Sequence, residues 1–347
     1  MLSERTLRLL ACPRDQRPLI PSTPAPSLGT GPSTPPGDPS TALGTGSLTC
    51  AEGHRYSIIE GIPILLRDDV EQTHWAAVLS LESARLGAAL DDWAAPVARE
   101  GVHPFVQESI GATGGNLYRS LIGRLPKYPI PEMPLEAGHG RTLVDVGCNW
   151  GRWTIAAARR GYRPIGIDPS LQALLAARAV CAQLGVDADF VIGDARHLPL
   201  RSGSIDTAFS YSVIQHFSKT DAAQAAADVG RVLAPGGTAL VQMPNVYGVR
   251  CLVQQARRRF RAPQKFEVRY WSPPELRRTF ERAIGPTRLS VDGFFSLNAQ
   301  PAEADILPAH LRALVHTSAA LARVANQVPP LVNVADSLWV TSTKSRS

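Results

Sequence analysis

The sequence has no long apolar run and few cysteines, and both features narrow the class of protein. None of its apolar runs approaches the roughly 18 residues that a membrane-spanning helix needs. The first ten residues contain Glu4 and only a short apolar stretch, which is unlike a secretory signal peptide. The five cysteines are odd in number and scattered, unlike a disulfide framework. We therefore expect a cytoplasmic protein without a membrane span.

One segment carries the strongest functional signal. It runs from Leu143 to Thr154 and reads Leu-Val-Asp-Val-Gly-Cys-Asn-Trp-Gly-Arg-Trp-Thr, a buried strand followed by a glycine turn and the start of a helix. Gly147 and Gly151 bracket the turn, where a ligand can approach bare backbone. Nucleotide-binding α/β folds bind their ligands in this way, at the carboxyl ends of the strands.

A second apolar strand supports this interpretation, because it ends in another acid. Ile165-Gly-Ile-Asp168 places a carboxylate 168 − 145 = 23 residues after Asp145. That spacing is close to the roughly 20 residues expected before an acid that binds ribose hydroxyls.

The form of the glycine turn separates two kinds of cofactor. A dinucleotide fingerprint reads G-x-G-x-x-G and directs backbone N–H groups at a pyrophosphate. Here Asn149 takes the place of the middle glycine, and Asp145 precedes the turn. That carboxylate repels phosphate and attracts the ammonium group of an amino acid. The turn therefore favours S-adenosylmethionine over a nicotinamide dinucleotide.

Five motifs in order, over residues of about 140 to 245, resemble a class I S-adenosylmethionine-dependent methyltransferase. The matching segments are Asp145–Gly151, Gly166–Ser170, Gly193–Pro199, Ser204–Phe217 and Arg231–Thr238, the last containing Leu-Ala-Pro-Gly-Gly. The departure is Asn149, where most members of the family have glycine. Five motifs in the family's order are far more specific than any one of them.

The resemblance implies roles for individual residues at the cofactor. Asp168, followed by Pro169, binds the ribose hydroxyls, and Asp194 with Ala195 meets the adenine. Asp145 either anchors the turn or holds a water near the donor's amino group. The remaining cofactor residues are Gly147, Asn149, Gly151 and Ser210. Trp150 and Trp153 either line the cofactor or pack the helix.

The acceptor side of the predicted site is less defined. Ser210, Tyr211, Gln215 and His216 follow the fourth strand, at the rim where an acceptor would lie. His216 and Tyr211 are the candidate catalytic residues. His216 titrates near neutral pH and is either a general base or a structural hydrogen-bond partner.

The predicted fold class is α/β. A Rossmann-like, mainly parallel seven-stranded sheet has helices on both faces, with a small N-terminal zinc-ribbon-like β domain and a helical cap. We expect strands near 142–147, 164–168, 188–192, 205–211, 238–243 and 337–341. Helices are expected near 70–90, 117–125, 151–161, 170–184, 220–233 and 308–327, and Ser272 with its following prolines suits another helix start.

Composition divides the chain into three regions. Residues 1–67 form the small N-terminal domain, with a disordered Pro-, Ser-, Thr- and Gly-rich loop at 21–47. Residues 68–139 form the helical cap and a linker, in which His103, Tyr118 and Arg119 either face substrate or are ordinary packing and surface residues. Residues 140–347 form the methyltransferase domain, with late helical insertions at 246–285 and 305–328.

The N-terminal region contains candidate metal ligands. With its loop removed, the pattern around Cys12 and Cys50 resembles the zinc-ribbon-like domain of the tRNA methyltransferase activator family. It is also similar to the N-terminal segment of a bacterial ribosomal RNA guanine methyltransferase family. Cys12, Asp15, Cys50 and His54 are the candidate ligands of a structural zinc. The alternative is a domain that kept the fold and lost the metal, with both cysteines packed as small apolar groups.

The acceptor is most consistent with a small molecule or a glycan, methylated on oxygen, nitrogen or carbon. The fourth strand lacks the N-P-P-[YF] tetrad of adenine or glutamine methylation. RNA is the alternative acceptor, supported by a net charge of +6 and the basic patch Arg257–Arg261. A third class is a non-catalytic interaction protein, against which the intact Asp168 motif argues. The sequence leaves the oligomeric state open.

Overall fold

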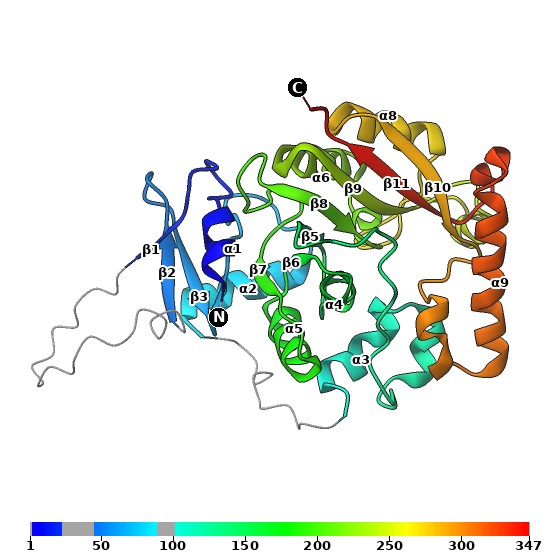
Figure 1. The fold of residues 1–347 in the computed structure, drawn as a ribbon, viewed down its shortest axis with the longest axis horizontal. Coiled ribbons are helices and arrows are strands. Elements are labelled where there is room, and N and C mark those ends of the chain that lie inside the picture. Colours follow the sequence, from blue (N-terminus) through cyan, green and yellow to red (C-terminus); the bar gives the residue numbers. More distant parts are fainter. Residues whose placement is uncertain (1, 23–44, 89–100, 347) are drawn as a thin grey trace, which may run out of the picture.

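The structure contains two sheets. It is a computed structural model that describes residues 2–22, 45–88 and 101–346. The small sheet is antiparallel and has the order β1 (Ile20–Ser22), β2 (Thr45–Thr49), β3 (Arg55–Ile59), β4 (Ile62–Pro63). The large sheet has seven strands in the order β10-β11-β9-β8-β5-β6-β7 (Figure 1).

Five neighbouring strands of the large sheet are parallel. They are β5 (Thr142–Val146), β6 (Arg163–Asp168), β7 (Asp189–Ile192), β8 (Ile205–Ser210) and β9 (Leu233–Pro244). At the other end of the sheet, β11 (Ser337–Thr343) runs antiparallel to both β9 and β10 (Thr287–Gly293). The predicted α/β class with a mainly parallel seven-stranded sheet is confirmed.

The strand order reverses at β5. From this strand the chain builds outward through β6 and β7 on one side, and then through β8 and β9 on the other. Loops leaving the carboxyl ends of β5 and β8 therefore diverge and open a crevice between them. Open α/β sheets bind their ligands at such a reversal point.

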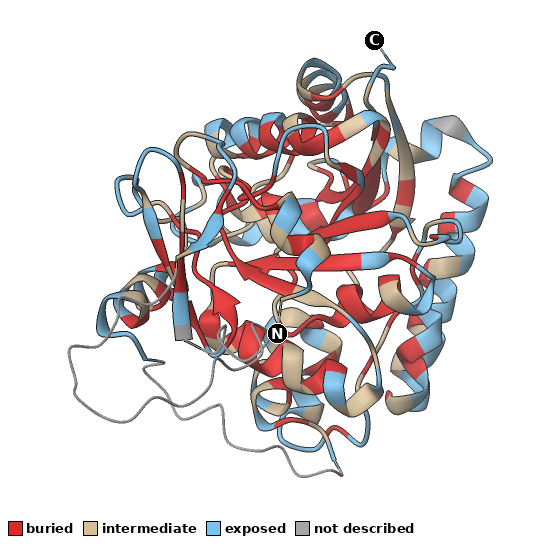
Figure 2. Cartoon of the chain, turned by 60° about the vertical axis from the view of Figure 1, so that its left-hand side comes forward, coloured by how far each residue is buried: buried red, intermediate tan, exposed pale blue. Residues whose placement is uncertain are grey.

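Helices cover both faces of the large sheet, because successive residues of its strands point to opposite faces and are apolar on both. Val144 and Val146 of β5 join the core that includes α6 (Lys219–Val232) and α8 (Pro273–Ala283), whereas Leu143 packs with α4 (Arg152–Arg159). The remaining helices are α5 (Leu171–Leu184), α7 (Val249–Arg257) and α9 (Ala309–Ala325), with α2 (Trp75–Leu86) and α3 (Pro104–Thr113) from the predicted cap. The strands form the buried centre and the outer faces of these helices are exposed (Figure 2).

Two elements were not expected from the sequence. The helix α3 continues through Gly111. This glycine lets Ile122 pack closely against the helix, since a Cβ there would lie 2.8 Å from Ile122 Cδ1. The strand β10 lies at the sheet edge with only Val291 and Gly293 buried, and it is too polar to stand out in the sequence. The helix predicted near 117–125 is a shorter 3₁₀ segment, η2 (Asn116–Leu121). The helix α8, placed in an insertion by sequence, packs against α6, β10 and β11 as part of the outer layer.

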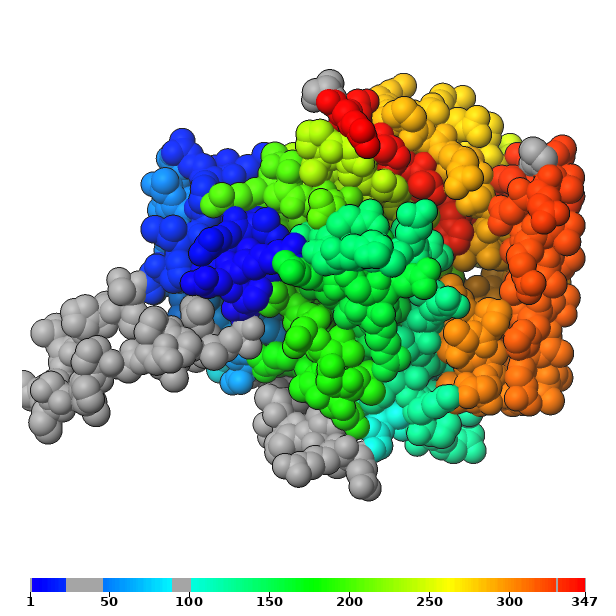
Figure 3. All heavy atoms as spheres, viewed as in Figure 1, coloured from blue at the N-terminus to red at the C-terminus, as the bar shows by residue number. Residues whose placement is uncertain are grey.

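The N-terminal unit packs directly on the edge strand β7. Leu65 N donates to Ile192 O at 2.8 Å, and Ala11 N donates to Pro199 O at 3.0 Å. Both units contribute side chains to one hydrophobic core, and they lie in contact in the space-filling view (Figure 3). The small sheet thereby covers an edge whose backbone groups would otherwise be open to unwanted pairing.

The helix α1 (Glu4–Leu9) strengthens this attachment. The Oδ2 atom of Asp189, at the start of β7, accepts hydrogen bonds from the hydroxyls of Ser3 at 2.5 Å and Thr6 at 2.6 Å. The predicted loop at 21–47 was too long at both ends, since β1 reaches Ser22 and β2 begins at Thr45. Its centre, 23–44, lies outside the described residues. Within the described ranges no helix is both long and apolar enough to cross a bilayer.

Candidate cofactor and acceptor site

A cavity of about 310 Å³ lies at the strand reversal point. Its walls come from the loops after β5, β6, β7 and β8 and from the cap helices α2 and α3. Eight of the predicted site residues line it: Gly147, Asn149, Asp168, Pro169, Asp194, Ala195, Tyr211 and His216. Residues that are up to 69 positions apart in sequence (216 − 147 = 69) therefore share one pocket.

Gly147 makes the turn after β5 possible. Its φ is +80°, and a Cβ built there would lie 2.3 Å from Val213 Cγ2. Its N–H donates to Ile167 O at 2.7 Å, which holds the turn against the end of β6. A side chain at this position would be both strained and blocked. Gly151 is also left-handed and precedes α4, but it faces Ala177 and does not line the cavity.

Asn149 adopts the left-handed backbone conformation that glycine usually occupies in this turn. Its φ is +47°, a region that asparagine tolerates better than other side chains. The amide Oδ1 accepts a hydrogen bond from Trp150 N at 2.8 Å, and Asn149 N donates to Asp168 Oδ2 at 2.9 Å. The departure from glycine therefore keeps the backbone shape and fixes the carboxylate behind it.

Asp168 presents its carboxylate to the cavity at the end of β6. Its two oxygens accept hydrogen bonds from Asn149 N and from Ser170 N, the latter at 3.0 Å. Each oxygen keeps a further lone pair for a ligand hydroxyl. Burial raises the pKa of Asp168 to about 6, against the opposing effect of these two N–H donors. A bound cation or hydroxyl pair would favour the ionised form.

Asp145 lies behind the turn and is only 2% exposed. It accepts a hydrogen bond from Thr154 Oγ1 at 2.7 Å and does not line the cavity. Burial raises its pKa to about 7, and the nearby charge of Asp168 adds to the effect. Of the two roles considered for Asp145, this geometry favours anchoring the turn.

Two other predicted cofactor residues have their polar groups engaged. The Ser210 hydroxyl donates to Val146 O at 2.9 Å, and Ser210 is absent from the cavity wall. The Asp194 carboxylate lines the wall but accepts from Arg196 Nη2 at 2.7 Å and from Arg196 N at 2.8 Å. Arg196 also contacts Asp221 at 3.1 Å, so Asp194 belongs to a buried ion-pair network.

His216 is held by hydrogen bonds at both ring nitrogens. Its Nδ1 lies 2.7 Å from Phe266 O and its Nε2 lies 3.3 Å from Gln215 Nε2. A proton on Nδ1, donated to the carbonyl, and a lone pair on Nε2 satisfy both contacts. The ring also stacks on Phe266 with centroids 4.0 Å apart. These contacts favour the structural interpretation of His216 over that of a free general base.

Tyr211 connects the cavity with an acid that the sequence did not single out. Its hydroxyl donates to Asp292 Oδ2 at 3.2 Å, and the same oxygen accepts from Ser337 Oγ at 2.6 Å. Burial raises the pKa of Tyr211 well above its usual value and that of Asp292 to about 6. Asp292 stands on the unexpected strand β10, which explains why the pair was missed.

The segment before α4 and the cap complete the cavity wall. Trp150 and Trp153 both line it; Trp150 Nε1 donates to Thr113 Oγ1 at 3.1 Å, and Trp153 packs against Tyr211. From the cap come Trp75, Phe105 and Thr113. His103, Tyr118 and Arg119 do not reach it: the His103 ring caps α3 through Phe105 N, and Tyr118 is fully buried elsewhere.

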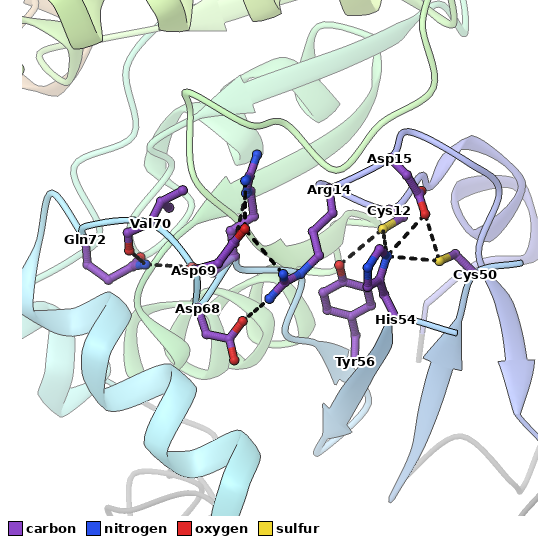
Figure 4. A network of polar contacts seen from close by, with 11 residues as sticks. Cys12, Arg14, Asp15, Cys50, His54, Tyr56, Asp68, Asp69, Val70 and Gln72 are labelled. Carbon is purple, nitrogen blue, oxygen red and sulfur yellow. Dashed lines mark hydrogen bonds and ion pairs between the residues drawn. The ribbon is translucent and has the colours of Figure 1, made fainter. Parts of the chain in front are cut away.

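The four candidate metal ligands of the N-terminal unit lie together, as Figure 4 shows. Their donor atoms all fall within 4.8 Å of one another. His54 Nδ1 is 3.5 Å from Cys12 Sγ, 3.4 Å from Cys50 Sγ and 3.2 Å from Asp15 Oδ2. Asp15, which stands where a second cysteine would complete C-x-x-C, points at the same centre.

The class of domain follows from the fold and this cavity, and comparison with known proteins agrees. The model of the family described as "Methyltransferase domain" matches residues 143–237, which hold the turn, Asp168 and Asp194. A probable S-adenosylmethionine-dependent methyltransferase of Mycolicibacterium smegmatis is 33% identical over 106 residues, 30% of this chain and 39% of that protein. Residues 143–237 therefore match a methyltransferase-domain family, and the name of this relative gives S-adenosylmethionine as the methyl donor of that protein.

Other relatives match over similar parts. A 37.1 kDa protein of a Streptomyces fradiae transposon is 39% identical over 114 residues, 32% of each chain. The biotin biosynthesis protein BioHC of Cellvibrio japonicus is 30% identical over 194 residues, 54% of this chain and 34% of that protein. The chain thus spans about a third of the length of these curated relatives.

Solved structures of similar shape were also found. A chain from the complex of the Haloferax volcanii Trm112 methyltransferase activator with a methyltransferase has a TM-score of 0.44 at 19% identity, over 70% of this chain and 95% of that one. The YcgJ protein of Bacillus subtilis has a TM-score of 0.42 at 19% identity, over 61% of this chain and 95% of that one.

The role of Asn149 predicts two opposite results for substitutions. Asn149→Gly should leave the free energy of unfolding within about 1 kcal/mol of wild type, because glycine adopts the same φ freely. Asn149→Val should lower it by about 1–3 kcal/mol, because a β-branched residue is strained at positive φ. Urea denaturation of both variants measures the difference. Equal destabilisation by glycine and valine would contradict the backbone explanation.

Proposed function

We propose that the protein transfers the methyl group of S-adenosylmethionine to a small-molecule or glycan-type acceptor. The observation that carries this proposal is the Asp168 carboxylate, which faces the cavity at the end of β6. Its position beside the Gly147 turn suits a ligand with a ribose and a cationic amino-acid arm. A phosphate-bearing cofactor would meet the Asp168 carboxylate, which repels it.

The chemistry asks little of the protein beyond alignment. The acceptor's lone pair attacks the methyl carbon, the carbon–sulfur bond breaks, and its electron pair returns to sulfur, which becomes a neutral thioether. The acceptor then loses its proton. Because the sulfonium is already a strong electrophile, proximity and orientation supply most of the acceleration. In this proposal the turn and Asp168 fix the donor while Trp153, Tyr211 and Phe266 shape the space for the acceptor.

We propose Tyr211, more than His216, as the acceptor-side catalytic residue. Both residues line the cavity, but both ring nitrogens of His216 are engaged, whereas the Tyr211 hydroxyl donates to a carboxylate, that of Asp292. Burial raises the pKa of Asp292 to about 6, close to the range in which a carboxylate accepts a proton efficiently near neutral pH. An acceptor proton would pass to solvent or, through the Tyr211 hydroxyl, to Asp292.

A small acceptor is favoured over RNA by the aromatic lining of the cavity and by the pairing of the basic patch. Trp153, Tyr211 and Phe266 line the cavity, as is common in small-ligand sites. In the patch, Arg258 and Arg261 both lie beside Glu267, the latter at 2.7 Å. Arg257 and Arg259 remain exposed. Two of the four arginines thus share a carboxylate, which weakens the case for phosphate contacts.

We further propose that the N-terminal unit is zinc-ribbon-like and holds one structural zinc. A tetrahedral ion with ligands at about 2.0–2.3 Å separates those ligands by roughly 3.3–3.8 Å. Three of the measured separations, 3.5, 3.4 and 3.2 Å, fall in or next to that range. The set of two sulfurs, one imidazole nitrogen and one carboxylate oxygen is chemically suited to zinc. Bound there, the metal would join Cys12 and Asp15 to the hairpin of Cys50 and His54.

Donor binding is predicted to depend on the ionised Asp168. Asp168→Ala should weaken binding of S-adenosylhomocysteine at least about 30-fold, since it removes charge-assisted hydrogen bonds to the ribose. In wild type the affinity should fall as the pH drops from 7.5 through about 6, because protonation removes the charge. Isothermal titration measures both effects, with Asp187→Ala, an exposed acid, as control. Absence of binding by wild type would overturn the proposed function.

The acceptor class is tested by radiolabelled methyl transfer into a fractionated lysate. Label should enter the small-molecule or glycan fraction, and Tyr211→Phe should slow it at least about tenfold. Retention of the protein on total RNA should be weak and should not show the steep salt dependence of phosphate contacts. Label in RNA, together with salt-dependent retention that Arg257→Ala/Arg259→Ala abolishes, would favour the RNA alternative.

The zinc proposal predicts about one zinc per chain in protein purified without chelators. Cys50→Ser should lose the metal and lower the melting temperature, because ligand loss removes metal-linked folding energy. Cys181→Ser is the matched control, since Cys181 is also a buried free thiol but lies on α5. Mass-spectrometric metal analysis gives the stoichiometry. Wild type that is metal-free and unaffected by zinc or chelator would show that the cluster only packs.

A further inference from the structure

The cavity wall contains one buried cation that neither the turn nor the ribose contact explains. Arg152 is the first residue of α4, directly after Gly151, and is only 4% exposed. Among the described residues that line the cavity, it is the only lysine or arginine. Its guanidinium carbon lies 5.7 Å from the centroid of the Trp153 ring, which supports the side chain from one side.

Only one of the three guanidinium nitrogens of Arg152 has a partner within the described structure. Nη2 donates to Asn298 O at 3.1 Å and to Glu303 Oε1. Nε and Nη1 are both shielded from solvent, and neither has a hydrogen-bond partner there. Buried polar groups are nearly always paired, and a buried charge is costly when its donors are unmet. Arg152 also lines the cavity, so a ligand bound there is one partner that these donors could take.

Glu303 fixes the orientation of this guanidinium. It belongs to the 3₁₀ segment η4 (Pro301–Ile306), is 2% exposed and accepts a second hydrogen bond from Gln300 N at 2.8 Å. It therefore holds Arg152 from the side of η4. Burial raises the pKa of Glu303, opposed by the charge of Arg152.

The ligand that fits is a monoanion. Asp168 lines the same cavity at the end of β6, and its carboxylate disfavours a multiply charged phosphate there. A carboxylate carries one negative charge and matches the donors of a guanidinium. We propose that Arg152 is the carboxylate-binding residue of the cavity and that Glu303 is its positioning residue. This inference rests on the proposed function, in which the bound carboxylate belongs either to the methyl donor or to an acidic acceptor.

Titration with two ligands tests the donor as the source. S-adenosylhomocysteine and 5′-deoxy-5′-methylthioadenosine share the adenosine and the thioether, but only the former has an amino-acid arm. Arg152→Met should weaken S-adenosylhomocysteine about 10- to 100-fold and leave methylthioadenosine within about twofold. Glu303→Gln should lower the affinity for S-adenosylhomocysteine relative to that for methylthioadenosine by a smaller factor, since the arginine remains but is less well oriented. A merely structural role would weaken both ligands alike.

A second titration tests the acceptor as the source. Benzoate is the probe, added to the wild-type complex with S-adenosylhomocysteine. Binding of benzoate that Arg152→Met abolishes, with the ratio of the two adenosine ligands unchanged, would support an acidic acceptor. The proposal is overturned if Arg152→Met changes neither the ratio nor benzoate binding.

Controls separate this result from misfolding and from failure of the proposed function. Arg231→Met removes an arginine paired with Asp228 on α6, outside the cavity, and should leave the ratio unchanged. The double variant Arg152→Met/Glu303→Met leaves no lone buried charge and should keep a cooperative melting transition. Wild type that binds neither adenosine ligand would contradict the proposed function. Benzoate, added without an adenosine ligand, would then decide this proposal: binding to wild type but not to Arg152→Met supports it, and equal binding to both overturns it.

Discussion

The site depends on a turn that is tied to the neighbouring strand. After β5 the chain reverses through Gly147, and the N–H groups of Gly147 and Cys148 both donate to Ile167 O, at 2.7 and 3.1 Å. Two residues later, Asn149 N donates to the Asp168 carboxylate. Because these bonds join the ends of β5 and β6, the loop at the cavity and the acid that lines it are held together.

The electrostatic character of the cavity follows from that unit. Asp168 faces the cavity and Asp145 lies behind the turn, and burial raises the pKa of both carboxyl groups. Binding of a positively charged ligand would offset the free-energy cost of burying these two carboxyl groups. Arg152 supplies the opposite charge at the start of α4. In our proposal, acids and arginine together match a donor that carries two cationic groups and one carboxylate.

Much of this arrangement was predictable because its determinants are local. The spacing of Asp145 and Asp168 placed two acids at adjacent strand ends, and parallel strands bring such ends together. The rest depends on distant contacts. Asp292 reaches Tyr211 only because β10 pairs with β11, and Glu303 reaches Arg152 from 151 positions away. The engagement of Ser210 with Val146 and of Asp194 with Arg196 likewise requires the packed structure.

A crystal structure of the protein with S-adenosylhomocysteine tests the central claim most directly. We predict the adenosine in the cavity between β5 and β8, with both ribose hydroxyls within hydrogen-bonding distance of the Asp168 carboxylate and the thioether directed toward Tyr211. A ligand bound elsewhere, or a ribose that does not contact Asp168, would contradict this account.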